Sequence, residues 1–140
     1  MVLPISDTLG IEFDTHSFPR HVLSYGMGVE STALLLRWIH EPQTRNFDLG
    51  DLVVITSHVG DEYTATATDV TECVLPELRR AAIRYVQVGR NRLNTSKSGE
   101  GITVFSDTAS PRRLYAEGAY SLSDELLAGG TIPQLGGSRR

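Results

Sequence analysis

Three short segments with strand-like patterns organise the first part of the chain. The segment 20–24 (RHVLS) lies between Pro19 and Gly26 and places a β-branched residue beside an aliphatic one. The segment 51–57 (DLVVITS) is a continuous apolar run of the kind that a parallel sheet buries on both faces. The segment 84–88 (RYVQV) alternates between apolar and polar positions. These patterns predict three β-strands.

Helical periodicity fills the two intervals between these strands. From Val29 the apolar positions recur with helical spacing, and Pro42 ends that pattern. A second helical pattern runs from Val70 to Ala82, in which Pro76 should kink the helix or begin a new first turn. The order β-α-β-α-β predicts an α/β fold with a mainly parallel sheet and right-handed crossovers.

The two ends of the chain carry weaker patterns. Residues 1–19 show no sustained period, and we interpret them as an irregular lead-in to a single domain over 20–140. A short strand over 102–105 and one or two helical turns over 122–127 are expected. Glycines and prolines then interrupt residues 129–137, so we expect a domain that is incomplete at its C-terminal end. A second copy of the chain or another partner could complete the sheet.

Composition narrows the functional classes. The formal net charge of −4 argues against a general nucleic-acid binder. All basic residues except Lys97 are arginine, so a phosphate would mostly meet guanidinium forks, such as those of Arg112 and Arg113. The single cysteine, Cys73, lies inside the second helical pattern and is expected to be buried and inert. No apolar run approaches the roughly 18 residues of a membrane span, and we predict a cytoplasmic protein.

The turn between the first strand and the first helix (SYGMGVEST, 24–32) carries the candidate chemistry. Ligands of open α/β sheets bind beyond the carboxyl ends of strands, where helix N-termini offer free N–H groups to anions. Gly26 and Gly28 can adopt positive φ and let a phosphate approach, while Ser31 and Thr32 add hydroxyl donors. The alternative is a tight turn whose hydroxyls cap the helix. Walker and dinucleotide fingerprints both fail, because the lysine and the third glycine are missing.

This turn resembles the PP-loop of the ATP pyrophosphatase family, whose signature reads Ser-Gly-Gly-x-Asp-Ser after the first strand. In the phosphoadenosine-phosphosulfate (PAPS) reductase-like branch, a serine and an aromatic residue commonly precede the signature. Ser24 and Tyr25 match those leading residues, Gly28 matches the second glycine and Ser31 matches the closing serine. The resemblance covers roughly residues 20–90 and predicts a phosphate-binding loop.

Three positions depart from the signature. Gly26 replaces the first serine, Met27 replaces the first glycine, and Glu30 stands where the family has aspartate. These differences leave open a second hypothesis, a non-catalytic nucleotide-binding or scaffold domain. A third hypothesis is a flavodoxin-like or other doubly wound domain without a nucleotide.

A second match follows the second strand. The letters VVITSHVGDE are similar to that strand of the PAPS reductase-like branch and to its Asp-Thr-Gly-Asp-Glu-like turn. Gly60, Asp61 and Glu62 match the end of that turn, whereas His58 and Val59 take the place of Asp-Thr. Carboxylate oxygens suit Mg²⁺, so Asp61 and Glu62 are the candidate metal ligands.

The resemblance implies a Rossmann-like, three-layer α/β/α arrangement of the adenine nucleotide alpha-hydrolase type. It also implies binding of ATP and Mg²⁺, with cleavage between the α- and β-phosphates that releases pyrophosphate and activates a substrate. Glu30 and Ser31 are the candidate catalytic residues. Sulfur transfer, tRNA modification and DNA modification all suit the branch, so a nucleic-acid substrate stays open. The candidate nucleotide-binding residues are Ser24, Tyr25, Gly26, Met27, Gly28, Val29, Thr32, His58 and Gly60.

Overall fold

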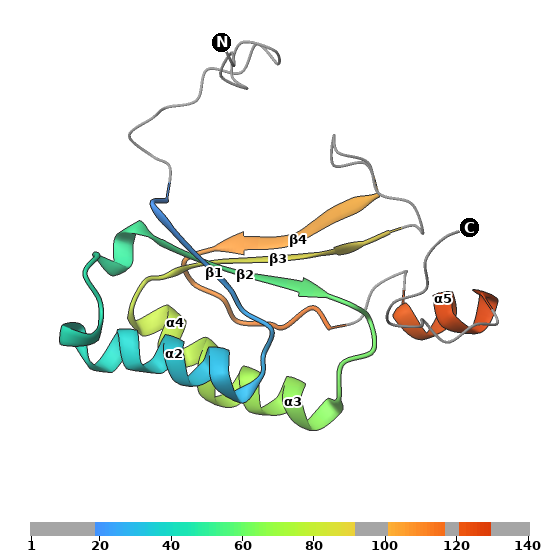
Figure 1. Ribbon diagram of the computed structural model, residues 1–140, viewed down its shortest axis with the longest axis horizontal. Helices are drawn as coiled ribbons and strands as arrows, with labels where there is room; N and C mark the ends of the chain where they lie inside the picture. Colours follow the sequence, from blue (N-terminus) through green and yellow to red (C-terminus); the bar gives the residue numbers. More distant parts are fainter. Residues whose placement is uncertain (1–18, 92–100, 117–120, 130–140) are drawn as a thin grey trace, which may run out of the picture.

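The computed structural model describes residues 19–91, 101–116 and 121–129 (Figure 1). Its sheet has four strands in the order β1-β2-β3-β4. The first three strands are parallel neighbours, and β4 pairs with β3 in the antiparallel sense. The predicted α/β fold with a mainly parallel sheet is therefore confirmed. The strands are β1 (His21–Ser24), β2 (Leu52–His58), β3 (Arg84–Arg90) and β4 (Ile102–Thr108).

Helices connect these strands along one face of the sheet. Figure 1 shows α2, α3 and α4 on the same side, so the described residues form one sheet layer and one helical layer. The predicted lead-in before residue 19 and the interrupted segment after residue 129 lie outside the described ranges. The helical elements are α2 (Val29–His40), η1 (Pro42–Thr44), η2 (Leu49–Asp51), α3 (Thr64–Asp69), η3 (Val70–Val74), α4 (Leu75–Arg80) and α5 (Leu122–Gly129).

The core lies between the sheet and these helices. Strand alternation sends Leu23, Val54 and Tyr85 toward the helices, which contribute Leu35 and Leu78 among other apolar side chains. Each such side chain stabilises the fold by roughly 1.5–3 kcal/mol relative to the exposed state. Tyr85 is buried in this core, and Trp38 packs against it while only partly buried.

The helical crossing from β2 to β3 changes its winding just before Pro76. Pro76 has no N–H group, so the usual bond to the carbonyl four residues earlier cannot form. The Leu75 N–H instead donates to the Val70 carbonyl, a five-residue spacing that makes η3 a π turn. Pro76 lies in the first turn of α4, as the sequence predicted.

A buried chain of hydroxyl groups ties the end of β1 to β2 and β3. Tyr85 Oη donates to Thr56 Oγ1 at 2.9 Å, and Thr56 Oγ1 donates to the Tyr25 carbonyl at 2.9 Å. Tyr25 Oη lies 3.0 Å from Thr32 Oγ1. Burial raises the pKa of Tyr85 to about 12 and also raises the pKa of Tyr25, so both phenols stay protonated at neutral pH.

Removing the buried phenol should destabilise this arrangement. We expect Tyr85→Phe to lower the free energy of unfolding by about 1–2 kcal/mol, because Thr56 loses its donor inside the core. Urea unfolding measures the change. Tyr63→Phe is the matched control, since Tyr63 is 83% exposed and should unfold like the native chain. Equal stability of the two variants would contradict the assigned role of the hydroxyl chain.

Candidate functional site

The candidate site lies where β1 and β2 end. Ser24 at the end of β1 is in register with Ile55, and β2 continues three residues further to His58. Because the two strands are parallel, the loop after β1 and the turn after β2 open at the same edge of the sheet. The two motifs that the sequence identified are therefore brought to one edge.

The turn after β1 places its backbone strain on Met27. Met27 has φ of 60°, in the left-handed region that non-glycine residues rarely adopt. The expectation that Gly26 and Gly28 take positive φ is wrong, and Gly28 has φ of −80° and ψ of 169°. The side chain of Met27 is buried, and that burial offsets the strain where the family signature has glycine.

Among the described residues, no side chain caps the start of α2. Gly28 is the N-cap residue, and the Thr32 N–H makes the first helical bond to its carbonyl at 3.0 Å. Ser31 Oγ donates to that same carbonyl at 3.2 Å, and the Thr32 hydroxyl pairs with Tyr25. The predicted capping of the helix by these hydroxyls is therefore wrong, and a tight turn with a purely structural role stays the alternative. The N–H groups of the first turn remain available to an anion.

Exposed residues surround the start of α2. Ser24 and Gly26 are exposed, Val29 is 81% exposed although it is apolar, and Glu30 is exposed in the first turn of α2. A carboxylate at this position interacts favourably with the positive end of the helix dipole. The loop thus presents N–H groups, one carboxylate and an uncovered apolar side chain to the solvent.

His58 faces the core rather than the solvent. Its Nε2 lies 3.0 Å from Gln87 Oε1, an oxygen that also accepts the Tyr115 N–H at 2.9 Å. Burial lowers the pKa of His58, while the bond to Gln87 and the charge of Glu62 oppose that shift. Its Nδ1 is buried without a hydrogen-bond partner among the described residues. The ring is therefore neutral at pH 7, and it orders the core next to the candidate site.

Asp61 holds α5 against the turn after β2. Both of its carboxylate oxygens accept hydrogen bonds from Ser123, one from the N–H and one from Oγ, each at 2.6 Å. The Leu122 N–H adds a bond to the Val59 carbonyl at 2.9 Å. Gly60, with φ of 79°, lets the turn reach this position. The Asp61 carboxylate is thus an anion bound at the N-terminus of α5.

The predicted metal ligands are the two carboxylates of Asp61 and Glu62. Within the described ranges, no group of three or more His, Cys, Asp or Glu side chains could hold a metal ion. Mg²⁺ is commonly held by one or two carboxylates together with substrate phosphates. The assignment of Asp61 and Glu62 to Mg²⁺ therefore stays a prediction.

Within the described ranges, a cavity lies on each side of the α3–η3 helix. One, of about 510 Å³, lies between this helix and α2 and reaches Gly28 and Val29 of the loop. Cys73 lines it and is exposed, so the prediction of a buried thiol is wrong. In η3, the apolar Val70 and Val74 face the core and the intervening Cys73 faces outward.

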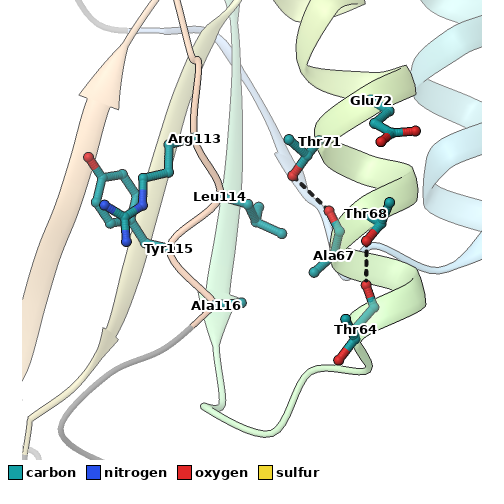
Figure 2. A pocket seen from close by; sticks show the side chains of 9 residues that line it. All are labelled: Thr64, Ala67, Thr68, Thr71, Glu72, Arg113, Leu114, Tyr115 and Ala116. Atoms are coloured by element: carbon teal, nitrogen blue, oxygen red, sulfur yellow. Dashed lines mark hydrogen bonds between the residues drawn. The ribbon is translucent and has the colours of Figure 1, made fainter.

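The other cavity, of about 360 Å³, lies between α3–η3 and the segment 113–116 (Figure 2). Leu114 and Ala116 point toward the helix, while Arg113 and Tyr115 lie on the opposite side of the segment. The Arg113 guanidinium stands 5.1 Å from the centre of the Tyr115 ring. Arg113, one of the two arginines predicted to contact phosphate, therefore stacks on an aromatic ring. A second arginine pair that could contact phosphate, Arg139 and Arg140, lies outside the described residues.

Comparisons with protein-family models, characterised proteins and solved structures find no match for this chain. None of the helices in the described ranges is long and apolar enough to cross a membrane.

Two polar residues that sequence reasoning passed over shape the site. Thr56 fixes the carbonyl that begins the loop, and the Gln87 side chain bonds the backbone of Arg113 and Tyr115. A signal was present for Thr56, which lies inside an otherwise apolar run, but not for Gln87, whose segment mixes apolar and polar residues. Buried polar side chains generally require hydrogen-bond partners, and both residues find theirs in segments that are distant in the sequence.

Because of the strain at Met27, glycine should be more stable than alanine at position 27, the reverse of their order in a helix interior. Both Met27→Gly and Met27→Ala lose the buried side chain, but only glycine relieves the left-handed backbone. We expect the glycine variant to be more stable than the alanine variant by about 1 kcal/mol in urea unfolding. In the helix interior, Ala33→Gly should instead cost about 1 kcal/mol. An alanine variant at position 27 that is the more stable of the pair would contradict the assigned conformation.

The contact between Asp61 and Ser123 predicts an acid-sensitive attachment of α5. Hydrogen bonds from Ser123 lower the pKa of Asp61 below its ordinary value of 3.8. The contact is therefore complete above that ordinary value and is lost as the pH falls through the lower folded-state pKa. We expect the exchange protection of the Ser123 amide to fall in that window. Asp61→Ala should remove the protection at neutral pH, whereas Asp124→Ala should retain it.

Proposed function

We propose that this chain binds ATP or a related adenine nucleotide where β1 and β2 end, with the phosphates on the N–H groups at the start of α2. The observation that carries the proposal is the uncapped helix start, which follows β1 directly and opens beside a cavity. Helix N-termini at the carboxyl ends of parallel strands bind anions through free N–H groups and the helix dipole. The PP-loop resemblance names the anion as a nucleotide phosphate.

The loop residues suit this ligand in charge and shape. Gly26 is exposed, and a Cβ atom built there would meet no atom of the described residues within 4 Å, so a phosphate could approach the backbone. Glu30 would repel bare phosphates, and Mg²⁺ carried by the nucleotide would offset that repulsion. Ser31 would add a hydroxyl donor from the same helical turn. Mg²⁺ and the loop N–H groups would together stabilise charge that develops between the α- and β-phosphates.

In the catalytic form of this proposal, the chain cleaves ATP and activates a substrate. Glu30 and Ser31 are then the residues closest to the reaction. A three-layer Rossmann-like arrangement would require a second helical layer on the other face of the sheet, supplied by a partner or by further chain. We place the activity in the cytoplasm, because the single cysteine suits a reducing compartment.

A second candidate function is nucleotide binding without cleavage. It is favoured by Asp61, because both of its carboxylate oxygens accept bonds from Ser123 and a metal ion would have to displace them. Met27 also favours binding without cleavage, because it replaces the first glycine of the PP-loop signature. A binding module would still use the start of α2 but would release no pyrophosphate.

The start of α2 can be blocked without harming the fold. Gly28 has extended backbone, and a Cβ atom there would meet only Glu30 Oε2 at 3.6 Å, so asparagine fits. Its side chain would accept from the first N–H groups and stabilise the helix by a few tenths of a kcal/mol. We expect Gly28→Asn to abolish the calorimetric binding of Mg²⁺-ATP while the unfolding midpoint is unchanged or raised.

Gly50→Asn is the matched control, since Gly50 is exposed and lies in η2, away from the loop. Ser31→Ala should weaken ATP binding by about tenfold through the lost donor. Pyrophosphate assayed in the same samples separates an enzyme from a binding module. Saturable binding that survives in Gly28→Asn would show that the phosphates lie elsewhere and would overturn the proposal.

A further inference from the structure

The groove between α2 and α3–η3 is continuous with the loop. Gly28 and Val29 line its end at the loop, Ala33 lies along α2, and Thr66 and Cys73 lie along the facing helix. In Figure 1 these two helices run on the same face of the sheet. The groove volume of about 510 Å³ lies within the range of roughly 300–1,000 Å³ that is typical of small-molecule sites.

The charge of the groove limits what it can hold. Asp69 is the one charged side chain among its lining residues, so the groove would repel phosphate. Within the described part of the chain, the Asp69 carboxylate and the Thr66 hydroxyl have no hydrogen-bond or ion-pair partner. By contrast, the hydroxyls of Thr68 and Thr71 donate to backbone carbonyls. The groove therefore suits an uncharged part of a ligand. That part would contact the apolar walls and could form hydrogen bonds with the Asp69 carboxylate and the Thr66 hydroxyl.

We propose that this groove binds the nucleoside part of the nucleotide, with the Asp69 carboxylate accepting hydrogen bonds from the ribose hydroxyls. The inference rests on the proposed function, since the phosphates would lie on the adjoining loop. A carboxylate is the group that commonly recognises ribose hydroxyls in nucleotide sites of α/β folds. The base would lie against Ala33 and cover Val29, which is 81% exposed without it.

The electrostatics orient the ligand in one direction. Phosphates are favoured at the start of α2 by free N–H groups and disfavoured beside Asp69. The uncharged ribose and base have the opposite preference, because the groove walls are largely apolar. One end of the ligand is thus held by the loop and the other by the groove.

Cys73 provides a probe of the groove, because it is exposed, lines the groove and is the single cysteine of the chain. The experiment measures alkylation of Cys73 by iodoacetamide with the full chain. We expect adenosine or Mg²⁺-ATP, each at ten times its Kd, to slow alkylation by about tenfold. Inorganic tripolyphosphate carries no nucleoside and should leave the rate unchanged.

Variants test the role of Asp69. We expect Asp69→Asn to weaken adenosine and ATP by about tenfold and to leave the affinity for tripolyphosphate unchanged. Glu72→Gln is the matched control, because it removes the same charge from the same helix at a residue that lines the other cavity (Figure 2). It should leave all three affinities unchanged, and urea unfolding verifies that both variants fold.

The outcomes separate this inference from the proposed function. Calorimetric binding of ATP with an unchanged Cys73 rate, or with full affinity in Asp69→Asn, would overturn the groove assignment and leave the loop assignment standing. An absence of binding by ATP, adenosine and tripolyphosphate would overturn both.

Discussion

The hydrogen bonds of Thr56 determine how the chain leaves the sheet at the candidate loop. Its hydroxyl accepts from Tyr85 on β3 and donates to the carbonyl of Tyr25, so one side chain on β2 connects β3 to the first residue after β1. All three residues are buried, and an unpaired polar group there would cost about 1–3 kcal/mol. The backbone that enters the loop is therefore held from inside the core, and the strained residue that follows is held by its own burial.

Gln87 has a similar role one strand away. Its carboxamide donates to the Arg113 carbonyl and accepts from the Tyr115 N–H, so it replaces a backbone partner for that segment. The same oxygen also lies 3.0 Å from His58 Nε2, and this hydrogen bond holds the neutral imidazole ring in place. The Gln87 amide therefore helps to hold this segment, together with the hydrogen bond from Arg79 Nη1 to the Pro111 carbonyl and the packing of Leu114 against the core. Thr56 and Gln87 thus hold the segments that follow β1 and β4, while the loop after β1 stays exposed at the end of the sheet.

Much of the fold followed from local pattern. The three parallel strands, the helix that begins at Val29 and a new first helical turn at Pro76 were predicted, because periodicity and proline act over a few residues. The turn after β1 was identified for the same reason. Its internal geometry was not, since the expected positive φ at Gly26 and Gly28 falls on Met27. A buried side chain can stabilise a conformation that local preference disfavours, and burial depends on residues that are distant in the sequence.

By itself, the sequence determined the order of elements, the position of the candidate loop and the charge balance that argues against a general nucleic-acid binder. The tertiary structure decided the partners of the polar side chains. It brought Asp61 to Ser123, turned His58 toward Gln87 and exposed Cys73 on a groove wall. Periodicity reports which side of an element is apolar, but a hydrogen bond between residues far apart in the chain exists only once packing has brought them together.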